Sequence, residues 1–94
     1  MRKYEVMYII RPEAEQEAVQ AIVEKFEGII NSGGEVTKTD LMGKRRLAYE
    51  INKHRDGIYV LVHFNATPEV VNELDRVIKI SDDIIRYLIV KDVA

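Results

Sequence analysis

The chain has 94 residues and a mass of 10.9 kDa, the size of one small domain with a single hydrophobic core, so one domain spanning residues 1–94 is predicted. Hydrophobic residues make up 47% and charged residues 32%, a mixture typical of a soluble globular protein and too apolar for a disordered chain. The absence of cysteine excludes disulfide scaffolds, thiol chemistry and thiolate metal sites. A formal net charge of −2 gives no overall attraction to nucleic acid.

The two signs of charge are separated along the chain. Residues 13–27 contain five glutamates and one lysine, whereas residues 38–55 contain six basic and two acidic residues. The near-zero total therefore averages an acidic segment and a basic one. No secretory leader is predicted at the N-terminus, and the longest apolar runs, such as residues 58–62, are far shorter than the roughly 20 residues of a membrane helix.

The first half of the chain predicts a strand and then a helix. Residues 4–10 are rich in Tyr, Val and Ile on both faces of a period-2 pattern, which favours a central strand that ends at Arg11-Pro12. Val19, Ile22, Phe26 and Ile29 then follow helical spacing, with the glutamates of residues 13–27 on the opposite side. Asn31-Ser32-Gly33-Gly34 is expected to end this helix, because glycine adopts the left-handed conformation common at helix C-termini.

The second half predicts a hairpin, a helix and a last strand. Residues 36–52 form a long strand in which Gly43 indicates a bulge or bend, and residues 52–57 form the loop into a strand at 58–64. Thr67-Pro68-Glu69 starts a second helix. The last strand spans residues 84–91. The expected buried stripe of the second helix is Val70, Leu74, Val77 and Ile78.

The order β-α-β-β-α-β predicts an α+β, ferredoxin-like sandwich: a four-stranded antiparallel sheet with two helices on one face. Tyr59, Leu61 and His63 alternate along one strand and are assigned to the open face of the sheet. An exposed apolar patch of this kind more often meets a protein than a base. Because this fold carries many unrelated functions, function has to be sought in particular residues.

Catalytic and metal chemistry find little support in the sequence. Ser32 and Ser81 stand at helix ends, where turn or capping roles are expected, and His54 and His63 have no carboxylate at metal-ligand spacing. Asp82-Asp83 is more typical of a turn than of a metal pair. Acylphosphatase-like enzymes share the fold but place a glycine-rich phosphate loop where this chain has Arg11-Pro12-Glu13. We therefore predict no enzyme, no metal site and no cofactor.

The run Lys44-Arg45-Arg46 is the most concentrated positive charge in the chain. It fits either a solvated edge strand that blocks aggregation or a phosphate-binding surface. Since neighbouring strand residues alternate, Lys44 and Arg46 share one side and Arg45 takes the other. A base-stacking surface of the RNA-recognition-motif type is disfavoured, because residues 56–63 keep little of that motif beyond Gly57 and Leu61.

The stretch from Gly43 to Asn52 resembles a known signature: Gly, any residue, a basic residue, a polar residue, Leu, a small residue, Tyr, any residue and Ile. It is similar to the bacterial small-subunit ribosomal protein S6 family, as are residues 1–12 and 85–91. The resemblance implies a cytoplasmic, ribosome-associated structural protein that binds the central domain of 16S ribosomal RNA as a heterodimer with ribosomal protein S18. It implies RNA- or partner-binding roles for Arg2, Lys3, Tyr4, Lys44, Arg45, Arg46, Arg86 and Lys91.

Two features complete the expectations. Many members of that family extend a charged C-terminal tail, whereas this sequence stops at Ala94, so contacts through such a tail are not expected. The alternative function is a regulatory domain that binds a small molecule in the interface of a dimer.

Overall fold

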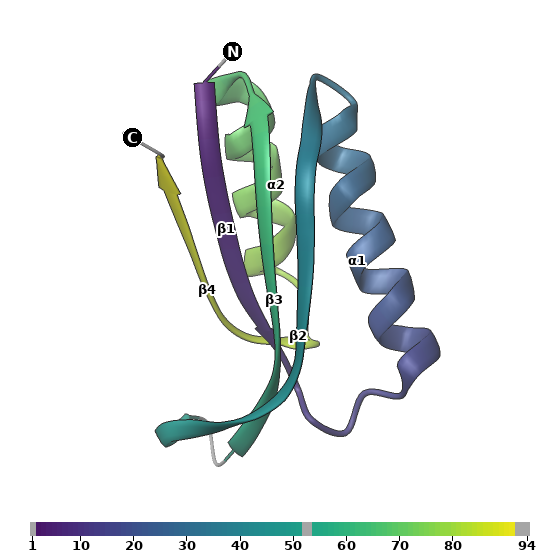
Figure 1. Ribbon diagram of the computed structural model, residues 1–94, viewed down its shortest axis with the longest axis vertical. Coiled ribbons are helices and arrows are strands. Elements are labelled where there is room, and N and C mark those ends of the chain that lie inside the picture. The colour runs from purple at the N-terminus through teal and green to yellow at the C-terminus, as the bar shows by residue number, and fades with distance from the viewer. Residues whose placement is uncertain (1, 52–53, 92–94) are drawn as a thin grey trace.

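A computed structural model describes residues 2–51 and 54–91 of the chain. The strands are β1 (Arg2–Ile10), β2 (Gly34–Ile51), β3 (His54–Ala66) and β4 (Ile84–Lys91), and the helices are α1 (Gln16–Asn31) and α2 (Pro68–Lys79). The strands form a four-stranded sheet in the order β2-β3-β1-β4, with every neighbouring pair antiparallel (Figure 1). The predicted ferredoxin-like α+β architecture is confirmed.

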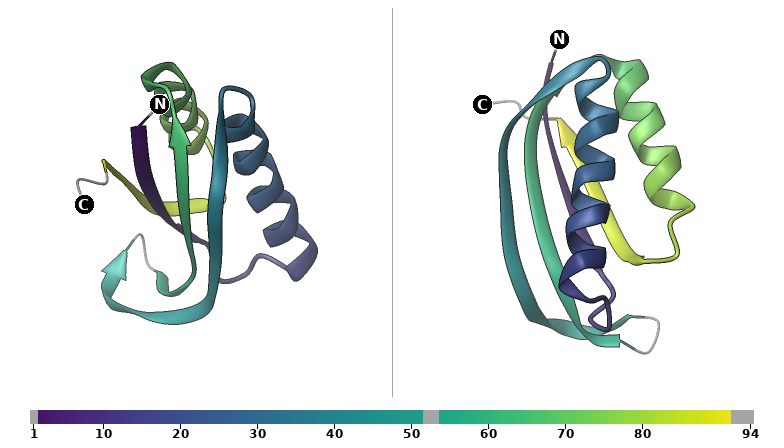
Figure 2. Two further views of the ribbon diagram at one scale, coloured as in Figure 1. Left: turned by 45° about the horizontal axis from the view of Figure 1, so that its top comes forward. Right: turned by 90° about the vertical axis from the view of Figure 1, so that its right-hand side faces the viewer.

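Both helices cover the same face of the sheet, and we call the other side the open face (Figure 2). The core lies between the helices and the sheet, where Tyr8 meets Phe26 edge to face with ring centroids 5.0 Å apart. Within the described residues, no helix is long and apolar enough to cross a membrane. Among the described residues, the largest fully buried side chains are those of Val6, Tyr8, Ile10, Phe26, Ile30, Val60, Val62, Phe64, Leu74 and Ile78.

The central strands behave as their composition predicts. β1 lies between β3 and β4, and β3 lies between β2 and β1. Residues at even positions of β3, from Ile58 to Ala66, are buried against the helices, so Tyr59, Leu61 and His63 lie on the open face as predicted. On the open face, the apolar side chains of a central strand are flanked by side chains of a neighbouring strand on each side, which leaves Tyr59 and Leu61 only partly exposed.

Helix α1 begins at Gln16, so Glu13, which the sequence analysis counted on its acidic side, lies before the helix. Glu13 belongs to the connection that follows β1. The buried stripe contains Val19, Ile22 and Phe26 as predicted, but Ile30 is fully buried where the sequence pattern favoured Ile29, which is only partly buried. Glu17 and Glu24 on the acidic side of the helix are exposed to solvent, whereas Glu27 is half-buried and accepts a hydrogen bond from the Thr39 hydroxyl.

The end of α1 is placed correctly by the sequence, but the predicted reason is wrong. The cap residue is Ser32 with a right-handed φ of −68°, and Gly43 is the one described glycine with positive φ. Gly33 and Gly34 are needed for space instead. A Cβ on Gly33 would lie 2.6 Å from Cγ2 of Val70, and one on Gly34 would collide with the carbonyl oxygen of Asn65 in the neighbouring strand.

The β2–β3 hairpin is longer than predicted. Residues 54–57, expected in the loop, belong to β3, and Arg46 pairs with Asp56 in the ladder. Residues 52 and 53 of that expected loop lie outside the described residues. The paired ends of β2 and β3 continue beyond the rest of the sheet and bend (Figures 1 and 2). The predicted bulge is confirmed, since the register shifts between Leu41 and Gly43, whose φ is +83°.

The last two elements match their predictions closely. Thr67 has the extended backbone of an N-cap, Pro68 is the first helical residue, and all four residues of the predicted stripe of α2 are buried. Strand β4 spans residues 84–91 as expected. An ion pair fixes its start, because Arg11 Nε donates to Asp83 Oδ1 at 2.7 Å and ties the end of β1 to the entry of β4.

Candidate nucleic-acid and partner-binding surface

The two ends of the chain supply basic residues to one end of the sheet. Tyr4 pairs with Lys91 across β1 and β4, so Arg2, Lys3 and Lys91 gather there, and all three are exposed. We call these three residues the terminal group. Tyr4 itself points to the helix side and stacks on Phe64, with ring centroids 5.7 Å apart, so its ring contributes to packing.

The remaining predicted residues lie toward the other end of the sheet. The basic run Lys44-Arg45-Arg46 is exposed on β2. Strand β2 is an edge strand, as expected if the run serves to block aggregation. Arg86 on β4 pairs with Ile9, which in turn pairs with Tyr59, the partner of Gly43. Arg86 therefore shares a row with the start of the basic run, and we call these four cations the lower group.

The bulge at Met42 decides which way each cation of the run faces. Leu41 pairs with Val60 and Gly43 with Tyr59, so Met42 is the additional residue. Beyond it, Lys44 opposes the buried Ile58, whereas Arg45 opposes Gly57. The predicted alternation is confirmed, and Arg45 is the member of the run on the open side, together with Lys3 and Arg86.

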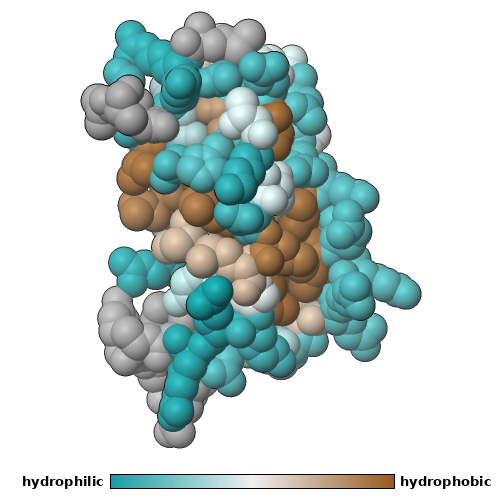
Figure 3. All heavy atoms as spheres, viewed as in Figure 1, coloured by the Kyte–Doolittle hydropathy of each residue, from teal (hydrophilic) through white to brown (hydrophobic). Residues whose placement is uncertain are grey.

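On the open face, an apolar strip separates Lys3 from Arg45 and Arg86. Leu61 pairs with Met7, and Met7 pairs with Leu88, so these side chains form one row across three strands. Leu88 and the nearby Val90 are 56% and 40% exposed. We call Met7, Leu61, Leu88 and Val90 the apolar band. Figure 3 shows hydrophobic side chains gathered across the middle of this face, with hydrophilic ones above and below.

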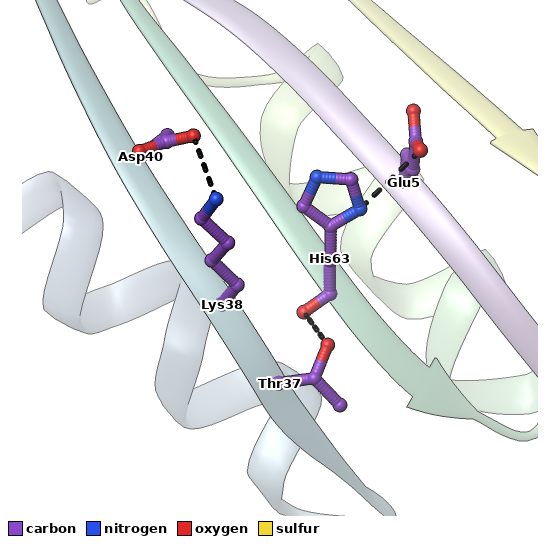
Figure 4. Close-up of polar contacts among 5 residues, drawn as sticks. All are labelled: Glu5, Thr37, Lys38, Asp40 and His63. Carbon is purple, nitrogen blue, oxygen red and sulfur yellow. Dashed lines mark hydrogen bonds and ion pairs between the residues drawn. The ribbon is translucent and has the colours of Figure 1, made fainter.

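A polar cluster that the sequence analysis did not single out lies beside the terminal group (Figure 4). His63 Nδ1 is 3.3 Å from Glu5 Oε1, and Lys38 Nζ is 3.6 Å from Asp40 Oδ2. Glu5 and His63 oppose each other in the register of β1 and β3. In the sequence, Glu5 and His63 alternate with apolar residues, and this alternation could have placed them on the open face. The position of Lys38 could not be predicted in this way, because it depends on a second bulge that no glycine marks.

Two of the residues considered for catalytic or metal chemistry, Ser32 and Asp83, have structural partners. The Ser32 hydroxyl donates to the Ile29 carbonyl at 2.6 Å, and Asp83 is held by Arg11. Among the described residues, no group of three or more His, Asp or Glu side chains is arranged to hold a metal ion.

Two groups at the surface have pKa values shifted by structural hydrogen bonds. The hydrogen bond to Asp75 on α2 raises the pKa of Tyr87, and the hydrogen bond from Arg76 lowers the pKa of Glu73. Shifted pKa values are candidates for catalysis when they cluster in a cleft, whereas these groups are spread over helix and strand contacts.

The fold and this surface define a ferredoxin-like protein whose candidate functional residues lie on an exposed sheet and its ends, as expected of a macromolecule-binding protein. The sequence profile of the ribosomal protein S6 family matches residues 3–91. The chain belongs to that family. It is thus a structural component of the small ribosomal subunit rather than an enzyme, and it is cytoplasmic and ribosome-associated.

Similar proteins agree over nearly the whole chain. The small ribosomal subunit protein bS6 of Desulforamulus reducens is 59% identical over 98% of this chain and 98% of its own length. That of Moorella thermoacetica is 58% identical over 97% and 94%, respectively. The crystal structure of 30S ribosomal protein S6 from Thermotoga maritima superposes with a TM-score of 0.92 at 32% identity, covering 97% of this chain and 87% of that one.

Proposed function

We propose that this chain binds the central domain of 16S ribosomal RNA as a heterodimer with ribosomal protein S18. The observation that carries the proposal is the order of side chains along the open face, where the apolar band lies between Lys3 of the terminal group and Arg45 and Arg86 of the lower group. A band of exposed apolar side chains suits a protein surface, and flanking cations suit phosphates. We infer that the partner covers the band while RNA contacts the basic ends.

The separation of the two basic groups supports independent phosphate contacts. Arg86 pairs with Ile9 of β1, which lies six positions from Lys3 in the same strand. At roughly 3.3 Å per residue, the two basic groups are therefore about 20 Å apart. This distance exceeds the Debye length of about 8 Å at physiological salt, so the groups act separately on the RNA. Losses of affinity from the two groups are therefore expected to add.

The net charge explains why a partner is needed. Affinity for RNA grows with the number of phosphates that cations neutralise, and a chain with net charge −2 brings few cations in excess. We expect weak, salt-sensitive binding by the isolated chain and tight, salt-dependent binding by the heterodimer. Filter binding or fluorescence anisotropy with a central-domain RNA fragment at several salt concentrations measures both. Equally tight binding by the isolated chain would refute the proposed role of the partner.

The contribution of the basic run is tested separately. Replacing Lys44, Arg45 and Arg46 together by Ala removes three exposed cations from an edge strand and is expected to leave the fold intact while weakening RNA binding by the heterodimer. Circular dichroism confirms the fold of the variant. Unchanged heterodimer affinity at moderate salt would mean that the run serves only to prevent edge-to-edge aggregation.

Association with ribosomes is tested by capture of the tagged chain from cell lysate. Small-subunit RNA and proteins are expected to co-purify, and ribonuclease treatment is expected to remove most of them while retaining ribosomal protein S18. Loss of ribosomal protein S18 after ribonuclease treatment would argue against a direct heterodimer.

A further inference from the structure

The open face contains a hollow of about 470 Å³ beside the terminal group. Its hydrogen-bond donors come from three strands: Lys3 on β1, Lys38 on β2, and His63 and Asn65 on β3. The register brings them together, because Lys3 opposes Asn65 and Lys38 opposes His63. These residues are far apart in the sequence, so only the sheet makes them neighbours.

A bulge places Lys38 in this hollow. Val36 pairs with Phe64 and Lys38 pairs with His63, which leaves Thr37 as an additional residue between them. The Thr37 hydroxyl donates to the His63 carbonyl at 2.9 Å and fixes the bulge. In a regular ladder Lys38 would instead oppose Val62, which is 1% exposed and faces the helices. The irregularity thus turns a lysine from the core side to the open face.

Three carboxylates contact the donors without closing the hollow: Glu5 beside His63, Asp40 beside Lys38, and Glu35, whose Oε1 accepts from Asn65 Nδ2 at 3.2 Å. The contact of His63 Nδ1 with Glu5 fixes the ring, and Figure 4 shows the other ring nitrogen on the side of β2. The Lys38–Asp40 pair is 3.6 Å long, and its two side chains are 65% and 51% exposed. An exposed pair of this kind contributes little to stability, so Lys38 is able to exchange Asp40 for another anion.

We propose that this hollow holds a backbone phosphate of RNA. The ammonium groups of Lys3 and Lys38 and the amide of Asn65 match a phosphate, and His63, whose Nδ1 faces Glu5, donates through its other ring nitrogen as the imidazolium. The volume lies in the range of sites that take a nucleotide-sized ligand. Arg2 and Lys91 of the terminal group lie at the same end of the sheet but oppose the inward-facing Ala66 and Tyr4, so Lys3 is the member of that group on the face of the hollow. The inference rests on the RNA binding proposed above and assigns to it two residues, Lys38 and His63, outside the sequence-predicted set.

The experiment is a titration of the isotope-labelled chain followed by NMR, with inorganic phosphate, acetate and a hexamer of uridylate as probes at constant ionic strength. Saturable shift changes concentrated at Lys38, His63 and Asn65 are expected with phosphate and with the RNA hexamer. Lys38→Ala is expected to weaken both by about tenfold, as befits the loss of one charge-assisted hydrogen bond. Lys25→Ala, which removes an exposed lysine from α1, is the matched control and is expected to change neither affinity.

Three results would overturn the proposal. Acetate binding as tightly as phosphate would assign the hollow to a carboxylate of a protein partner. Equal affinities for the Lys38 and Lys25 variants would show that the hollow is not the binding site, as would RNA-induced shifts confined to residues 44–46. The capture of small-subunit RNA described above does not depend on this titration, so failure of the hollow and failure of the proposed function are distinguishable.

Discussion

Replacing Tyr8 by Phe is expected to stabilise the protein. The Tyr8 side chain is 0% exposed, and its hydroxyl has no hydrogen-bond partner among the residues that the structure describes. A buried hydroxyl without a partner costs about 1–3 kcal/mol of folding free energy, which the substitution recovers. The void left by the missing oxygen atom lowers this gain in folding free energy by roughly a few tenths of a kcal/mol. The edge-to-face contact with Phe26 is retained, because the ring is unchanged.

The expected net gain is about 1–2 kcal/mol, measured as the free energy of unfolding in a urea titration. For a chain of this size, 1 kcal/mol corresponds to a rise in Tm of about 4–8 °C. Tyr87→Phe is the matched control, because the Tyr87 hydroxyl donates to Asp75 at 2.7 Å. That variant is expected to lose about 0.5–1.5 kcal/mol. A Tyr8→Phe protein less stable than wild type by about 1 kcal/mol or more would show that the buried hydroxyl is satisfied.

The pH dependence of stability gives an independent check of the same reasoning. Burial, and to a smaller extent the Glu27 carboxylate, raises the pKa of Tyr8 above its ordinary value near 10. A raised pKa in the folded state contributes stability that is present below about pH 10 and is lost as the pH rises, because the unfolded tyrosine ionises first. Wild-type stability is therefore expected to fall by up to about 1.4 kcal/mol per pH unit from this group above pH 10. The Tyr8→Phe protein should lack this component, and an identical alkaline profile would contradict the assignment.

Three further predictions concern the hairpin and the open face. Gly34→Ala is expected to lower the free energy of unfolding in urea by about 1–3 kcal/mol, because its Cβ meets the backbone of β3. The control Gly28→Ala in α1, whose Cβ meets nothing within 4 Å, is expected to raise it by about 0.5–1 kcal/mol. Similar effects of the two variants would contradict the packing argument. Leu88→Lys is expected to weaken partner binding at least about tenfold, as measured by calorimetry. Ile80→Lys, at a 66% exposed position at the end of α2, is the control and is expected to leave the affinity unchanged. Equal affinities of the two variants would exclude the apolar band as the docking surface. If RNA crosses the open face, Arg45→Ala should lower the salt slope of heterodimer binding by about 1, and an unchanged slope would place Arg45 outside the interface.

The sequence predicts the elements where one periodicity extends over many residues. In α2, the spacing of Val70, Leu74, Val77 and Ile78 matches the buried face, and Thr67 and Pro68 mark its start. The prediction fails where local signals compete with tertiary pairing. Asp56-Gly57 is typical of a turn, yet it lies in β3, because pairing of Asp56 with Arg46 extends the ladder past it. Gly57 is required there for a different reason, since a Cβ would collide with the side chain of Ile9.

For the candidate site, the sequence identified the cations but not the surface that they share. The basic run and the terminal residues are visible in the sequence, and their alternation was predicted correctly. Lys38 and His63 were missed, because 25 positions separate them and only the register of β2 with β3 makes them partners.

The sequence by itself determined the order and type of the elements, the central position of β1 and β3, and the separation of acidic from basic segments. Each of these follows from periodicity and composition within a short stretch of chain. The tertiary structure alone decided which face each residue of β2 presents, because bulges at Thr37 and Met42 each shift the alternation by one position. A one-residue shift exchanges the two faces of a strand. The surface proposed to bind RNA and a protein partner thus depends on two extra residues whose effect exists only when β2 is paired with β3.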